Sequence, residues 1–111
     1  MTLDEFRQTT AASHPPSPLS NALLALWHAA KGDWEAAHKL AQDMDDATGA
    51  WIHAYLHRQE GDLGNAAYWY RRARKLESHA SLEAEWEQIA IAVLADTKGN
   101  GEGKFTIEPT E

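Results

Sequence analysis

A Gly-Asp pair that occurs twice, 29 residues apart, limits what this chain can fold into more than any other feature of its sequence. The two copies, Gly32-Asp33 and Gly61-Asp62, each separate two stretches in which apolar residues recur at helical spacing. Glycine readily adopts the left-handed conformation that ends a helix, and aspartate can accept hydrogen bonds from the free N–H groups that begin the next one. Because a link this short turns the chain back on itself, the sequence predicts two helical hairpins.

The two hairpins align over Asn21–Met44 and Ala50–Ala73. The second helix of each copy carries its apolar residues at the i, i+3, i+4, i+7 spacing of an amphipathic helix. We therefore expect the shared alanines at close helix contacts and the larger side chains between the hairpins. The identical pairs are Ala25/Ala54, His28/His57, Gly32/Gly61, Asp33/Asp62 and Ala37/Ala66.

The segments on either side of the hairpins predict further helices. Residues 2–12 can form a short helix, and Ser17-Pro18 is typical of a helix start. Ser81 opens an apolar stripe that runs to about Asp96, which we expect to close the end of the second hairpin. The sequence thus predicts one all-α domain over 1–97, with hairpin one at 18–44, hairpin two at 47–76 and a capping helix at 81–96. The turn-rich segment 98–111 predicts a flexible tail in which Lys104–Glu108 can form a short strand.

Composition restricts the classes of protein open to this chain. The formal charge of −7 disfavours broad contact with nucleic acid. The absence of cysteine excludes disulfides and thiolate metal sites, and it is compatible with a cytoplasmic location. No apolar stretch approaches the roughly 18 residues of a membrane span, and the first ten residues lack the apolar run of a secretory signal. We therefore expect a cytoplasmic protein that binds neither nucleic acid nor a membrane.

The hairpins resemble the tetratricopeptide repeat in their small residues, the Gly-Asp turn and the alanine early in the second helix. The stretches "GDWEAAHKLAQD" and "WIHAYLHRQEGDLGNAAYWYRRA" are also similar to a group of small bacterial proteins of this type that has no assigned activity. The resemblance implies antiparallel hairpins stacked in a right-handed sense, with a concave groove that binds extended peptides. The chain departs from the usual pattern in its spacing of 29 and in the lack of a closing proline.

One face of the helix around residues 48–60 is rich in the residue types that dominate binding hot spots, namely Trp, Tyr and Arg. By the resemblance, this face lines the groove, and the first repeat contributes a small apolar floor. We therefore predict a protein- or peptide-binding site, with two alternatives: cover by the N-terminal helix or the tail, and formation of a homodimer. The predicted site consists of Trp51, Tyr55, Arg58, Gln59 and Leu26.

The same helix carries His53 and His57 four residues apart, with Glu60 extending their face. This spacing is acceptable for a metal held by imidazole and carboxylate. A hydrolase of the zincin class is excluded because it needs a glutamate directly after the first histidine, where Ala54 stands. The repeat-equivalent His28 favours a packing role for these histidines. The alternative is a metal or acid–base site built on His28, His53, His57 and Glu60.

The sequence contains no pattern of an activated nucleophile, a phosphate-binding loop or a dinucleotide-binding turn. We therefore expect a non-catalytic protein with no metal and no cofactor. His38 and His79 have no evident partners and are expected to be exposed. In the second hairpin we expect Trp69 and Tyr70 in the core. The outer face then carries Tyr68, Arg71 and Lys75, which is the next candidate for a binding surface.

Overall fold

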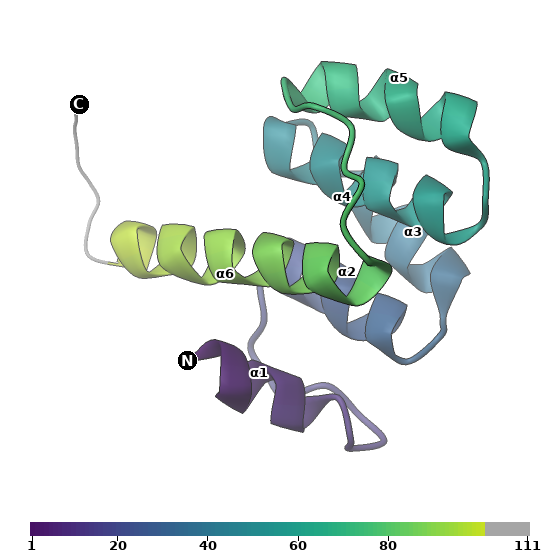
Figure 1. The fold of residues 1–111 in the computed structure, drawn as a ribbon. Helices are drawn as coiled ribbons and strands as arrows, with labels where there is room; N and C mark the ends of the chain where they lie inside the picture. The colour runs from purple at the N-terminus through teal and green to yellow at the C-terminus, as the bar shows by residue number, and fades with distance from the viewer. Residues whose placement is uncertain (102–111) are drawn as a thin grey trace.

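The computed structural model of the protein describes the backbone of residues 1–101 and the side chains of residues 1–96. The described residues form six helices and no strand, which confirms the predicted all-α class (Figure 1). None of these helices is long and apolar enough to cross a membrane. The helices are α1 (Leu3–Thr9), α2 (Asn21–Ala30), α3 (Trp34–Gln42), α4 (Ala47–Gln59), α5 (Leu63–Ala73) and α6 (Leu82–Gly101).

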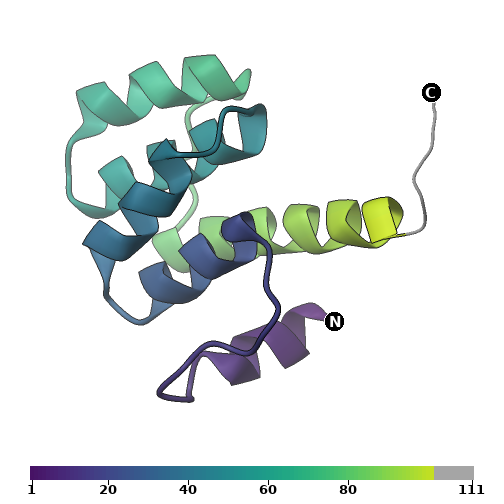
Figure 2. The same ribbon diagram turned by 180° about the vertical axis from the view of Figure 1, so that it is seen from behind.

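The two Gly-Asp turns have the predicted conformation. Gly32 and Gly61 have φ angles of 82° and 85°, which place both in the left-handed region that favours glycine. The carboxylates of Asp33 and Asp62 each accept a hydrogen bond from a backbone N–H in the next helix, both at 3.2 Å. As a result, α2 packs against α3 and α4 packs against α5, while α3 also contacts α4 (Figure 2).

The helices before the first turn begin and end at other residues than predicted. The N-terminal helix ends at Thr9, short of the predicted residue 12. Helix α2 begins at Asn21, because the hydroxyl of Ser20 accepts the backbone N–H of Leu23 at 3.2 Å and caps the helix there. The predicted helix start at Ser17-Pro18 is therefore wrong.

The last helix begins as predicted. The hydroxyl of Ser81 accepts the backbone N–H of Ala84 at 3.0 Å, and α6 then continues to Gly101, beyond the predicted end near Asp96. The first residues of the predicted tail thus belong to α6. The rest of that tail, including the candidate strand Lys104–Glu108, lies outside the described residues.

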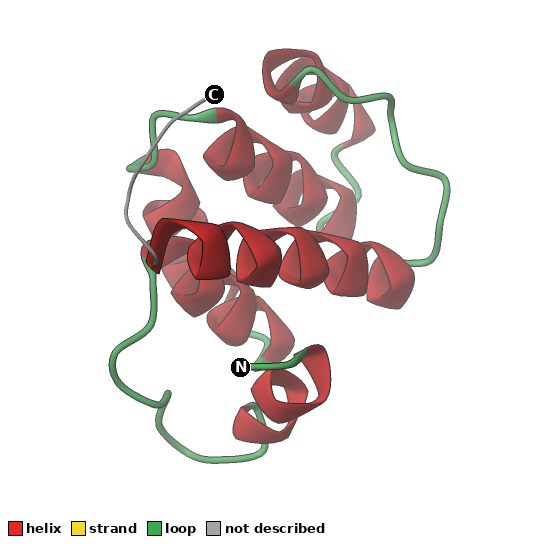
Figure 3. Ribbon diagram, turned by 90° about the vertical axis from the view of Figure 1, so that its left-hand side faces the viewer, coloured by secondary structure: helices red, strands yellow, loops and turns green. Residues whose placement is uncertain are grey.

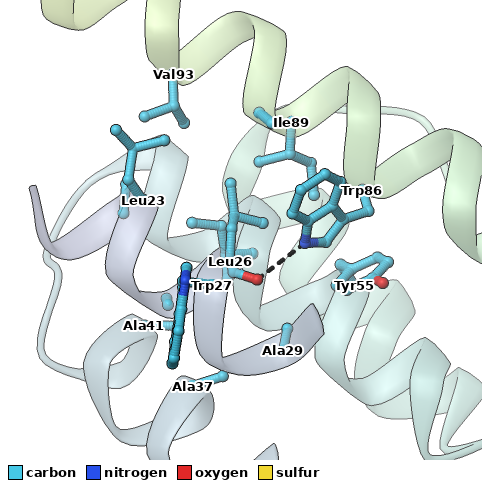
Figure 4. Close-up of a cluster of buried hydrophobic side chains, with 14 of the residues drawn as sticks. Leu23, Leu26, Trp27, Ala29, Ala37, Ala41, Tyr55, Trp86, Ile89 and Val93 are labelled. Carbon is cyan, nitrogen blue, oxygen red and sulfur yellow. Dashed lines mark hydrogen bonds between the residues drawn. The ribbon is translucent and has the colours of Figure 1, made fainter. Parts of the chain in front are cut away.

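Helix α6 lies across the first helices of both hairpins, α2 and α4, instead of closing the end of the second hairpin beyond α5 (Figure 3). Its apolar stripe is buried at Trp86, Ile89 and Val93. The indole N–H of Trp86 donates to the backbone carbonyl of Leu26 at 2.9 Å (Figure 4). The ring of Trp86 stacks on that of Phe6 of α1, with 5.6 Å between centroids. The main core is therefore formed by α1, α2, α4 and α6 together with Ala37 and Ala41 of α3.

Candidate functional site

Helix α6 covers the face that the sequence predicted to line a peptide-binding groove. Tyr55 is only 4% exposed and lies beside Trp86 in the core, and Leu26 is fully buried (Figure 4). Trp51 and Arg58 are half-buried and donate hydrogen bonds to α6. The prediction of one accessible patch is therefore wrong, because the chain's own helix occupies this face.

The covered face is held by a buried carboxylate from α6. Glu85 has no exposed surface. It accepts hydrogen bonds from the guanidinium of Arg58 at 2.6 Å, the hydroxyl of Tyr70 at 2.6 Å and the indole N–H of Trp51 at 3.0 Å. Burial, followed by the charge of Glu85, raises the pKa of Tyr55 to about 12. The carboxylate of Glu85 and the guanidinium of Arg58 neutralise each other. The hydrogen-bonding groups of Trp51 and Arg58, which were expected to bind a partner, are therefore already paired with α6.

A part of the predicted site stays open at the end of α4. Gln59 is exposed and lines a hollow of about 300 Å³ together with Ala29, Ala30 and Arg7. This hollow lies where α1, α2, α4 and α6 meet, since Trp86 and Glu83 of α6 complete its lining. It contains no cluster of ionisable groups that would favour one kind of ligand over another.

Three histidines converge on the opposite side of α4, where α3 packs against it. They are His38 of α3 and His53 and His57 of α4, and each offers a nitrogen atom within 4.8 Å of the other two. The pair on α4 shares a face because its members are four residues apart. His53 and His57 are 4% and 6% exposed, whereas His38 is half-buried. The predicted exposure of His38 is therefore wrong.

Two indoles fix the orientation of these imidazoles. Trp34 stacks on His38, with 4.6 Å between ring centroids and an interplanar angle of 12°. Trp69 stacks on His53 at 3.8 Å and 9°, and it is half-buried where it packs against the smaller core cluster of Ala54, Ala66 and Tyr70. Tyr70 does lie in the core, as predicted. The histidine cluster therefore has rigid aromatic walls on both sides.

Glu60 orients the third imidazole. Its carboxylate lies 2.5 Å from Nδ1 of His57. An ionised carboxylate at this distance keeps the proton of the neutral ring on Nδ1, so that Nε2 presents a lone pair. Histidine ligands of metals in proteins commonly have such a carboxylate partner. Of the predicted set, His53, His57 and Glu60 are therefore brought together.

His28 does not join the cluster. Its Nδ1 lies 3.7 Å from the carboxylate of Asp33, in the turn of its own hairpin. In both hairpins the backbone carbonyl of the histidine accepts the N–H of the turn aspartate at 2.9 Å, for His28 as for His57. The two histidines thus share one role in the turn, and only His57 has further histidines beside it. His38 takes the place that the sequence assigned to His28.

Burial favours the neutral form of two of these imidazoles, those of His53 and His38. Burial first, and then the charges of the neighbouring His38 and His57, lower the pKa of His53 from 6.5 to about 4. Burial and His57 also lower the pKa of His38, with Glu60 acting in the opposite sense. Neutral imidazole is the form that binds metal ions, so His53 and His38 do not have to lose a proton before an ion binds near pH 7.

His57, Glu60 and Asp62 form a second group whose ligand atoms lie within 4.8 Å of one another. Its two carboxylates already have partners, since Glu60 accepts from His57 and Asp62 caps α5. We therefore regard the group of three histidines as the better ion site.

Comparison with known proteins gives no further guide to the site. No family model, no curated protein and no solved structure matches this chain.

Proposed function

We propose that this protein binds a divalent transition-metal ion through His38, His53 and His57, with Glu60 orienting His57. The observation that carries the proposal is the convergence of three imidazoles from two helices, two of them almost fully buried. Buried polar side-chain atoms normally have at least one hydrogen-bond partner. Three histidines in contact, one with a carboxylate on its far nitrogen, have the composition of a first and second coordination shell.

The donor set also favours one group of ions. Imidazole nitrogen suits zinc, copper, nickel and iron(II), whereas calcium and magnesium prefer oxygen ligands. Zinc–nitrogen bonds of about 2.0–2.1 Å at tetrahedral angles separate ligand nitrogens by roughly 3.3 Å. The nitrogens of this cluster lie within 4.8 Å of one another, so small side-chain rotations bring them into range. We therefore expect zinc, nickel or copper to bind and calcium and magnesium not to bind.

A tetratricopeptide-like interaction module, right-handed in its stacking and cytoplasmic, is the second candidate. Because α6 covers the groove, this proposal moves to the outer face of α5. There the guanidinium carbons of Arg71 and Arg72 lie 6.0 and 5.9 Å from the ring centroid of Tyr68. Lys75, predicted for this face, lies beyond the end of α5 and 4.1 Å from the ring centroid of Trp51 on α4. The face is therefore formed by Tyr68, Arg71 and Arg72, and no described carboxylate lies within ion-pair distance of its two arginines. An acidic protein segment is the partner that this face suits best.

The test of the metal proposal is a titration of protein purified without an affinity tag and stripped with chelator. Zinc is added and the heat of binding is recorded. We expect one ion per chain, with binding lost in His53→Ala and His57→Ala. Glu60→Gln should weaken it roughly 10- to 100-fold, the usual effect of a second-shell carboxylate.

His28→Ala is the matched control, because His28 occupies the same position in the first hairpin and has the same backbone contact in its turn. It should bind zinc like the unaltered protein. Equal loss in His28→Ala and His57→Ala, with both variants folded by circular dichroism, would contradict the proposal. So would the absence of any binding at micromolar zinc.

A further inference from the structure

We infer that the metal ion bound at His38, His53 and His57 keeps an open coordination position, and that an external oxyanion, a carboxylate or a phosphate, binds there. This inference rests on the proposed function. It adds the class of external ligand that completes the coordination of the ion.

The first step is the number of ligands. Structural zinc sites are closed by four protein ligands, whereas sites with three leave a position for water or substrate. Among the residues whose side chains are described, the groups that can share an ion contain three members and not four. The nearest carboxylate, Glu60, is held by His57, and moving it onto the ion would give up that 2.5 Å contact. Three imidazoles therefore leave the coordination sphere incomplete.

The second step is access from outside. Helices α3 and α5 flank α4 on the side of the histidines, and no Cα atom of α3 lies within 8 Å of one of α5. A hollow of about 320 Å³ occupies the space between the α3–α4 connection and α5, and its lining includes Ala50 and Trp69. Ala50 precedes His53 by about one helical turn, and Trp69 stacks on His53. None of the three histidines lines this hollow, which meets the cluster only through Trp69, and the half-buried His38 is the most exposed of the three imidazoles.

The third step is charge. A divalent ion held by three neutral imidazoles keeps its full charge of +2, which favours an anion in the open position. Arg72 and Arg74 line the same hollow, and the guanidinium carbon of Arg72 lies 5.2 Å from the ring centroid of Trp69. Two carboxylates, those of Asp45 and Asp46, also line the hollow. The carboxylate of Asp46 accepts the backbone N–H of Gly49 at 2.8 Å and caps α4. The two arginines and the two aspartates of the lining balance in charge, so the charge of the bound metal ion is what favours an oxyanion.

The experiment uses cobalt(II) bound to the full chain, because the visible absorption of this ion reports its coordination number. Acetate and inorganic phosphate are then titrated separately. We expect at least one of them to change the cobalt spectrum along a saturating curve, with a tighter midpoint for the anion that the site prefers. Arg72→Ala should weaken that midpoint by about fivefold, the loss expected for one charged contact near the surface, and leave cobalt affinity unchanged.

Arg71→Ala is the control, because Arg71 directly precedes Arg72 on α5 and does not line the hollow. Failure of cobalt to bind would refute the proposed function itself. Cobalt binding with a spectrum that neither anion alters would overturn this inference and leave the metal site standing. An anion response that appears only in Glu60→Gln would also overturn it, since Glu60 would then be the fourth ligand.

Discussion

Replacing the buried carboxylate of Glu85 tests how α6 is held against the hairpins. Glu85→Gln keeps the shape of the side chain and removes its charge, which leaves the guanidinium of Arg58 at 16% side-chain exposure without a counter-charge. It also weakens the contacts with Tyr70 and Trp51, made at 2.6 and 3.0 Å. Breaking a buried ion pair by removing one partner costs about 3–5 kcal/mol. Because Gln keeps one acceptor oxygen, we expect the lower end, about 3 kcal/mol.

The assay is urea unfolding at neutral pH, followed by far-UV circular dichroism. Glu87→Gln is the matched control, because Glu87 lies on the same helix and pairs with Arg7 where both side chains are partly exposed. An exposed pair of this kind contributes about 0–1 kcal/mol. If Glu85→Gln loses no more stability than Glu87→Gln, the carboxylate does not hold α6 in place and the account of the covered groove is refuted. Pairing Glu85→Leu with Arg58→Met should recover only the part of the loss that comes from the unpaired guanidinium, since the Tyr70 hydroxyl and the Trp51 indole N–H still lack their acceptor.

Two further predictions use other parts of the fold. Gly49→Ala should destabilise the protein by about 1–3 kcal/mol in thermal unfolding, because an added Cβ would lie 2.6 Å from the Cβ of Met44. Gly64→Ala, whose added Cβ meets nothing within 4 Å, should instead stabilise the protein by about 0.5–1 kcal/mol. Equal effects of the two substitutions on stability would contradict the close packing of Gly49 against Met44. Folding lowers the pKa of His53 from 6.5 to about 4, so protonation of this ring favours the unfolded chain. The contribution of His53 to the stability of the metal-free protein should therefore be complete above pH 6.5, and at most about 3 kcal/mol should be lost as the pH falls toward 4. His53→Gln should remove most of this dependence, and an unchanged pH profile in that variant would show that other groups cause it.

The sequence predicted most successfully what depends on neighbouring residues. The Gly-Asp turns, their capping aspartates and the shared face of His53 and His57 all follow from spacing within one or two turns of helix. His38 was missed because it has no histidine partner on its own helix, and it meets the pair only because α3 packs on α4. Its spacing of four residues from Trp34, on which it stacks, was the available signal.

The covered groove was missed for a different reason. The residue types that favour a binding surface, as at Trp51 and Arg58, serve equally well for contacts within the chain. Glu85 stands among other glutamates in the sequence, and nothing in that pattern distinguishes a buried carboxylate from an exposed one. Its role depends on where α6 crosses α4, which spacing within one helix cannot predict.

The most direct test of the central claim is the coordination shell of the bound ion. Zinc-loaded protein at one ion per chain is measured by X-ray absorption at the zinc edge, and its crystals by anomalous diffraction. We expect three imidazole nitrogens at about 2.0–2.1 Å, from His38, His53 and His57, together with one light atom from solvent or an anion. A shell made only of oxygen atoms, or an anomalous peak at the turn carboxylates instead of between α3 and α4, would contradict the account.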